Sequence, residues 1–278
     1  MTGERPAWLE QDANLIRIVR VGVFGVIVVS VVYPFLAVVA TSLASAPDVI
    51  QNGGLVIWPR HPSLDAYHTV FAGGVVARAI KVSVTITCLG TLLSLAVTIG
   101  MAYGLSRRIW GGRLFLMLAL FTIFFTPGII PNYLTVKTYG LLNSYPALIL
   151  PVMMNAFSMI VLRQFFMGIP GEIIDSARMD GANDLQILTR IVLPLSKAVI
   201  AVIALFYAVG YWNDYFTALL YLSNSSMWPL PLVLRPYGAE SAPVPSAAIV
   251  VAILPILAVY PFLQRYFTRG VLSGAIKG

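Results

Sequence analysis

One apolar stretch of the sequence carries an unusual set of polar aromatic residues. Tyr207, Tyr211, Asp214 and Tyr215 follow one another at helical spacing, so a continuous helix would place them on one face. Their rings could stack on the C–H faces of a sugar, and their polar groups could bond its hydroxyls. A carboxylate in such surroundings is costly unless it faces a bundle interior or water. The pattern predicts a solute pathway, although Asp214 could instead serve helix packing or lie at the outer surface.

A second polar aromatic segment lies between Pro127 and Pro151. Its mixture of tyrosines and asparagines suits a stretch that faces the outer surface or a cavity, and an interfacial aromatic belt is the alternative interpretation. Taken together, the predicted pathway residues are Asn132, Tyr133, Tyr207, Tyr211, Trp212, Asn213, Asp214 and Tyr215.

The sequence has no arrangement of residues that predicts catalysis. It contains no G-x-x-x-x-G-K-[ST] phosphate loop, no paired carboxylates and no nucleophile with a base. His61 and His68 share one loop, but no third ligand accompanies them, so we interpret both as solvated and predict no metal site. We therefore expect neither an enzyme nor a chain with its own cofactor.

The composition is that of an integral membrane protein. Of 278 residues, 59% are hydrophobic and only 10% are charged. Apolar runs of about 20 residues alternate with short polar stretches, which predicts an all-α fold of six transmembrane helices. The net charge of +7 comes from basic residues at the ends of apolar runs, so we predict no nucleic-acid binding. The single cysteine, Cys88, lies inside such a run, and we expect it to be packed. The six predicted spans are 21–41, 79–105, 114–130, 147–162, 198–222 and 247–263.

Basic residues predict how the chain is oriented in the membrane. Arg107, Arg108 and Arg113 form a short loop without an acid, and such loops stay in the cytoplasm. Counting spans from this loop places both termini, 1–20 and 268–278, on the cytoplasmic side. We treat 1–278 as a single transmembrane domain.

One long stretch, Gly171 to Ser196, is charged and yet helically patterned. Gly181 followed by Asn183 offers a helix end and a new N-cap, so we predict two short helices joined at a bend, with Pro194 stopping the second. An amphipathic hairpin could also lie on the lipid surface. The predicted apolar stripe consists of Ile174, Ala177, Gly181, Leu185, Leu188 and Val192.

The hairpin contains the string D-S-A-x-x-x-G-x9-I-x-L-P, from Asp175 to Pro194. This string resembles the cytoplasmic coupling loop of the permease subunits of binding-protein-dependent ABC importers, in which the first letters are usually E-A-A. Asp175 and Ser176 replace the first two of those letters. The closing G-A-I-K-G and the segment 127–151 are similar to the second permease of maltose-type sugar importers, and more loosely to the branch that handles polysaccharide fragments such as alginate oligomers.

The resemblance implies partners and a place in the cell. It implies a bacterial inner-membrane protein that forms a heterodimer with a second permease, two ATPase subunits that bind ATP and Mg, and an extracytoplasmic solute-binding protein. The loop 168–196 would dock on an ATPase and pass its motion to the membrane helices. The residues implied in this coupling are Glu172, Asp175, Ser176, Ala177, Asp180, Gly181, Ala182, Leu193, Pro194, Lys277 and Gly278.

Two other function classes compete with an importer subunit. A stand-alone secondary transporter or channel would need no coupling loop, and no inverted repeat is evident in the sequence. A membrane-embedded enzyme would need a polar catalytic cluster, and only Asp214 hints at one. The importer subunit is the interpretation that accounts for the charged hairpin.

Overall fold

The computed structural model describes residues 14–107, 109–239 and 243–258. These residues are mainly helical, and the one β-bridge between them pairs Ala44 with Pro62. Their contacts group them into two compact units, one within 1–70 and 237–251 and the other within 71–236 and 252–278. We describe each unit by itself.

The first unit begins with a long apolar helix, α1 (Asn14–Ser42), whose side chains from Ile16 to Leu36 are exposed. Two short helices follow, α2 (Ala46–Gln51) and α3 (Asp65–Phe71). The buried carboxylate of Asp48 accepts hydrogen bonds from the backbone N–H of His61 at 2.8 Å and pairs with its Nδ1 at 3.1 Å. These bonds from His61 lower the pKa of the Asp48 carboxyl below its ordinary value.

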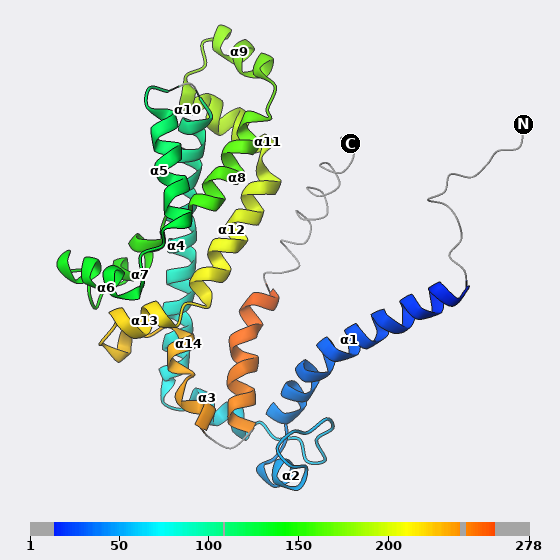
Figure 1. The fold of residues 1–278 in the computed structure, drawn as a ribbon. Helices are drawn as coiled ribbons and strands as arrows, with labels where there is room; N and C mark the ends of the chain where they lie inside the picture. Colours follow the sequence, from blue (N-terminus) through cyan, green and yellow to red (C-terminus); the bar gives the residue numbers. More distant parts are fainter. Residues whose placement is uncertain (1–13, 108, 240–242, 259–278) are drawn as a thin grey trace, which may run out of the picture. The chain divides into compact units, whose positions relative to one another are not determined.

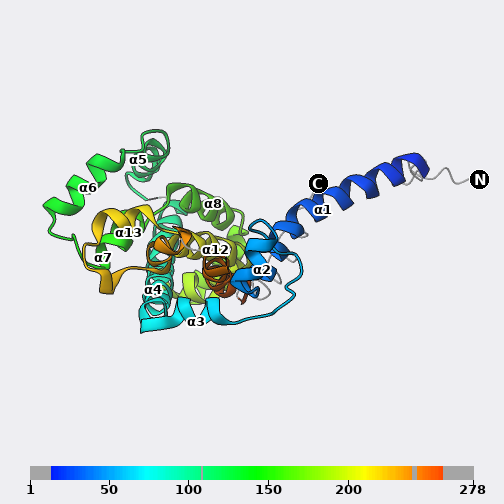
Figure 2. The ribbon, with the colours of Figure 1, turned by 90° about the horizontal axis from the view of Figure 1, so that it is seen from below.

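The second unit is organised around α4 (Val75–Ser106), which the 3₁₀ turn η2 (Ala72–Gly74) precedes. The helices α8 (Ala156–Met167) and α12 (Lys197–Trp212) pack along it, and α5 (Gly112–Phe124) packs on α8 (Figure 1). The view in Figure 2 shows α8 and α12 beside α4. The fully buried side chains Met159, Leu162 and Ile203 lie in the core of these helices.

Short helices lie toward the end of this unit that is opposite α9 (Gly171–Met179) and α10 (Asp184–Ile187) (Figure 1). The bounds are α6 (Ile129–Thr138), α7 (Pro146–Ile149), η3 (Leu150–Val152), α13 (Phe216–Tyr221), η5 (Ser225–Met227), α14 (Leu230–Val233) and η6 (Pro236–Ala239). The Leu230 N–H donates to Ser83 Oγ at 2.7 Å, which fastens α14 to α4.

The predicted spans agree only in part with the described helices. Two helical stretches are long and apolar enough to cross a membrane, Ile16–Ser42 and Asp65–Ser106, and they contain the first two predicted spans almost completely. The fourth span corresponds to a pair of helices bent by 53°. The fifth is divided, because α12 ends at Trp212 and α13 begins at Phe216. The third is divided, because α5 ends at Phe124 and α6 begins at Ile129, on either side of Pro127 and Gly128.

The last predicted span, 247–263, is described as far as residue 258, within the apolar helix Pro243–Ala258. Residues 259–263 and the basic tail 268–278 lie outside the described residues, as does most of the predicted N-terminal segment 1–20. What the described residues establish is a helical membrane fold, with two to four candidate spans by length and composition.

Candidate functional site

The charged stretch folds into the two short helices that its sequence predicts. α9 (Gly171–Met179) ends in a turn where Gly181 has a φ of 83°, a conformation that favours glycine. Asn183 then caps α10 (Asp184–Ile187), and its side chain and that of Gln186 bond each other's backbone N–H at 2.9 Å. The predicted bend at Gly181 and N-cap at Asn183 are both confirmed.

The second helix continues further than predicted. A π-helical stretch, η4 (Leu188–Val192), and α11 (Leu193–Leu195) extend it past Pro194, and it ends at Leu195. The chain then turns by 85° into α12. Pro194 therefore lies inside the last turn, where the missing N–H is tolerated because Ser196 closes the turn on the Val192 carbonyl.

The predicted apolar stripe is correct at its ends and wrong in its middle. Ile174 and Val192 are buried, but Leu185 is 69% exposed and Ile187 is fully buried in its place. The reason is the turn at 180–183, which resets the helical phase, so that spacing counted across it no longer predicts one face.

Most of the residues implied in coupling lie at the surface of the hairpin. Ala177, Ala182 and Leu193 are half-buried, and Lys277 and Gly278 lie outside the described residues. The exposed members are Glu172, Asp175, Ser176, Asp180, Gly181 and Pro194. The hairpin thus presents a charged surface that includes the large apolar side chains Met179 and Leu185.

Two of the predicted pathway tyrosines are held deep between α12 and α4. The Tyr211 hydroxyl lies 2.8 Å from Ser94 Oγ and donates to the Ile149 carbonyl at 3.4 Å. The Tyr207 hydroxyl lies 2.7 Å from Thr98 Oγ1 and accepts from the backbone N–H of Asn155 at 3.0 Å. Both hydroxyls therefore already have partners within the chain.

The Tyr211 ring also needs a glycine opposite it. A Cβ placed on Gly90 would lie 2.7 Å from two of the ring carbons, so α4 and α12 approach each other more closely here than any other residue would permit. Gly90, Ser94 and Thr98 follow at steps of four on α4. Sequence reasoning missed these three residues, although small residues at that spacing are a signal of close helix packing in membranes.

A cavity of about 310 Å³ opens beside the two tyrosines. Asp214 lines it as well, and its Oδ1 accepts the backbone N–H of Thr217 at 3.1 Å. The structure therefore brings three of the predicted pathway residues to one cavity. Other lining residues that the sequence did not indicate are Val152, Asn155, Phe206, Gly210 and Thr217.

The remaining pathway residues lie elsewhere. The prediction of one continuous face is wrong, because α12 ends at Trp212, and Asp214 and Tyr215 follow in a break before α13. The exposed Asn213 donates to the Val209 carbonyl, and Tyr215 packs edge-on against Phe216. On α6, Asn132 and Tyr133 are half-buried, and the Tyr133 ring lies 6.3 Å from that of Tyr221.

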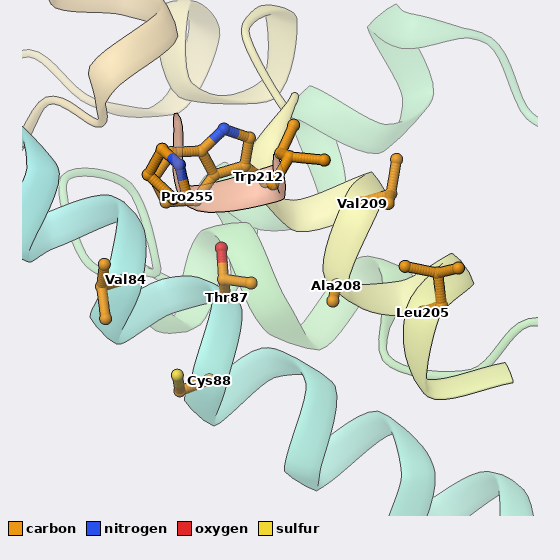
Figure 3. A pocket seen from close by; sticks show the side chains of 9 residues that line it. Val84, Thr87, Cys88, Leu205, Ala208, Val209, Trp212 and Pro255 are labelled. Carbon is orange, nitrogen blue, oxygen red and sulfur yellow. The ribbon is translucent and has the colours of Figure 1, made fainter. Parts of the chain in front are cut away.

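A second, apolar cavity of about 170 Å³ lies between α4, α12 and the helix Pro243–Ala258 (Figure 3). Trp212 is one of its walls and donates its indole N–H to the Ala252 carbonyl at 3.1 Å. Cys88 is exposed here, so the expectation that it is packed is wrong. The walls offer almost no polar groups, which separates this cavity from the one beside the tyrosines.

Apolar helices around a cavity with polar groups, together with a charged hairpin at one end, define a membrane transport subunit. Residues 94–273 match the family model described as the inner membrane component of binding-protein-dependent transport systems. The chain belongs to this family. It is a transport subunit and not an enzyme.

Individual relatives match this chain along most of their length. The chain is 46% identical to the polygalacturonan/rhamnogalacturonan transport system permease protein YtcP of Bacillus subtilis (strain 168), over 89% of this chain and 93% of that one. It is 44% identical to the protein LplC of the same organism, over 89% and 90%. Among solved structures, it is similar to a bacterial ABC transporter involved in the import of the acidic polysaccharide alginate, with a TM-score of 0.86, 32% identity, and coverage of 91% of this chain and 96% of that one.

Proposed function

We infer that this chain is the permease subunit of an ABC importer that carries a sugar or oligosaccharide into the cytoplasm. The observation that carries this inference is the likeness to the alginate transporter, at a TM-score of 0.86 over 91% of the chain. The relative YtcP, whose name specifies polygalacturonan and rhamnogalacturonan, supports the same class of cargo. ATP hydrolysis, with Mg, belongs to partner ATPase subunits.

The loop 168–196 is the part of the chain that docks on an ATPase. Its support is geometric: α9 exposes all of its acidic side chains and buries only Ile174, so the helix is free to enter a groove of another protein. Residues 1–278 then form one permease domain of six spans in the bacterial inner membrane, with both termini in the cytoplasm. A second permease completes the pathway, a solute-binding protein delivers the cargo, and the tail with Lys277 and Gly278 reaches the ATPases.

The cavity beside Tyr207, Tyr211 and Asp214 is this subunit's part of the pathway. The tyrosine hydroxyls are engaged within the chain, so Asp214, Asn155 and Thr217 are its main polar side chains for a sugar. Asn132, Tyr133, Trp212, Asn213 and Tyr215 do not line this cavity, and they would contact cargo only along another part of the route.

An acidic oligosaccharide fits the charge of the chain best. The sequence from 71 to 170 contains no Asp or Glu, and its charged residues are all basic. The stretch 71–170 therefore offers no negative charge to repel a polyanion, and Asp214 is the one acid among the residues that line the cavity. This agrees with the relatives, since the name of the alginate transporter describes its cargo as an acidic polysaccharide.

The test is reconstitution of the complex with its second permease, its ATPases and its binding protein in proteoliposomes. Oligogalacturonides and alginate oligomers should stimulate ATP hydrolysis and be taken up, and neutral arabino-oligosaccharides of equal length should do so less. Stimulation by the neutral oligomers alone would overturn the acidic cargo. Failure of the chain to co-purify with any ATPase would overturn the importer.

A further inference from the structure

One carboxylate oxygen lies where the hairpin meets the end of α4. Asp184 is the first residue of α10, and its Oδ1 accepts the Tyr103 hydroxyl of α4 at 3.4 Å. The same oxygen accepts Nη2 of Arg178, which belongs to α9, at 3.4 Å. A single atom therefore bonds side chains from two different helices.

The α4 side of this junction is firmly held. Tyr103 is buried, and the Arg107 guanidinium lies 4.8 Å from the centre of its ring. One turn away, Arg163 of α8 donates Nε–H to the Leu105 carbonyl at 2.9 Å. Tyr103 is thus a fixed point at the cytoplasmic end of the helix.

The α9 side is held much less. Ile174 is the one buried residue of α9, and the other ion pair of Arg178 is with Asp175 of the same helix, at 3.9 Å. Among the described residues, the bond from Arg178 to Asp184 therefore connects a side chain of α9 to a residue that is itself bonded to α4.

α4 connects this junction to the cavity. Thr98 and Ser94 lie five and nine residues before Tyr103 in the same helix, and their hydroxyls bond Tyr207 and Tyr211. α4 is one helix of 32 residues, so Tyr103, Thr98 and Ser94 move together if α4 moves as a rigid body. A shift of α9 that reaches Tyr103 would consequently reach the side chains that line the cavity.

We propose that Asp184 is a positioning residue, which sets the orientation of α9 relative to α4 through Arg178 and Tyr103 and so relates ATPase motion to the cavity. The proposal rests on the proposed function, in which α9 docks on an ATPase. Arg178 and Asp184 are exposed, and exposed ion pairs are weak. A weak contact suits this role, because it must break and form again in every transport cycle.

A simpler role for Asp184 is to place negative charge at the N-terminus of α10, which favours the helix. Tyr103→Phe separates the two roles. It keeps the buried ring beneath Arg107 and the charge at α10, and it removes the hydroxyl, which bonds Asp184 and also interacts with Arg107.

The experiment uses the reconstituted complex and measures uptake per ATP hydrolysed, together with the amount of ATPase that co-purifies. The variants are Asp184→Asn, Tyr103→Phe and the exchange of charges in Arg178→Asp with Asp184→Arg. Arg190→Gln is the matched control, because Arg190 is an exposed charged residue of the same hairpin, has no ion pair with the described residues and is not among the residues implied in coupling.

We expect Asp184→Asn and Tyr103→Phe each to lower uptake per ATP about threefold, with ATPase subunits bound as in the wild type. The exchanged pair should recover part of the loss from Arg178→Asp alone, and Arg190→Gln should behave as the wild type. Wild-type uptake per ATP in Tyr103→Phe would overturn the link to α4. Loss of bound ATPase from Asp184→Asn would make Asp184 a docking residue instead. If the wild-type chain binds no ATPase, the proposed function itself fails, which is a separate result.

Discussion

The charged hairpin and the contact between α4 and α12 are built by opposite means. In the hairpin, Gly181 and Asn183 are enough to set the path of the chain, because each acts on backbone within a few residues of itself. In the contact, the Tyr211 hydroxyl lies beside Ser94, 117 residues away in the sequence, and its ring lies on Gly90.

This difference separates an open surface from a closed contact. The hairpin holds four of the five acids between residues 71 and 236, and it buries few of its side chains, so its surface is available to a partner. The contact satisfies its own hydroxyls and fixes the walls of a cavity. Changes in the hairpin should therefore affect coupling, and changes in the contact should affect stability first.

The largest effect should come from Gly90→Ala. The added methyl group would lie 2.7 Å from the Tyr211 ring, which is buried and bonded at its hydroxyl, so the ring cannot yield cheaply. Overpacking of this kind costs about 1–3 kcal/mol. The melting temperature of the purified complex in detergent should fall.

Gly100→Ala is the control for this substitution. Gly100 lies in the same helix, and a Cβ there would meet no atom within 4 Å, so the melting temperature should be unchanged or higher. Equal melting temperatures for the two variants would contradict the close approach of α4 and α12.

Local signals explain which parts of this architecture are predictable. The turn at Gly181 and the cap at Asn183 follow from residues that favour one backbone conformation, and the structure has both. The exposure of Leu185 and the break after Trp212 were not predictable, because a count of helical spacing assumes that the helix continues. The partners of Tyr207 and Tyr211 come from a different helix, and no local rule identifies them.

The second largest effect should come from Gly181→Val. A β-branched residue at a φ of 83° is strained by about 1–2 kcal/mol or more, although there is room for its side chain. The hairpin should re-aim α9 to relieve the strain. Substrate-stimulated ATP hydrolysis and uptake should fall while membrane insertion and the melting temperature of the helices change little.

Gly171→Val is the matched control, because Gly171 is in the same hairpin, is helical and has open space around it. It should couple as the wild type does. Unimpaired uptake in Gly181→Val would show that coupling does not depend on the bend at Gly181.

A smaller effect should separate the two tyrosines. Tyr207→Phe leaves the backbone N–H of Asn155 without its acceptor. Tyr211→Phe removes the hydroxyl that bonds Ser94 and also removes the 3.4 Å bond to the Ile149 carbonyl. A buried N–H without an acceptor costs more than a carbonyl that loses one donor. We therefore expect the free energy of unfolding to fall by about 1–3 kcal/mol in Tyr207→Phe and by about 1 kcal/mol in Tyr211→Phe. Denaturation of the purified complex measures both, and the reverse order would mean that Asn155 has another partner.

The smallest effect should come from Asp214→Asn, which tests whether the one acid between residues 71 and 236 that lies outside the hairpin acts through its charge. Its Oδ1 accepts the Thr217 N–H in the first turn of α13, and an amide oxygen accepts that bond equally well. Stability should therefore change by less than about 0.5 kcal/mol, whereas Asp214→Ala should cost about 1 kcal/mol. Uptake of an acidic oligosaccharide should continue in Asp214→Asn, because the substitution keeps a hydroxyl partner in the cavity and removes a charge that repels the cargo. A large loss of uptake with unchanged stability would show instead that the carboxylate charge itself is required. The cavity would then resemble the hairpin, where the charge of Asp184 pairs with Arg178.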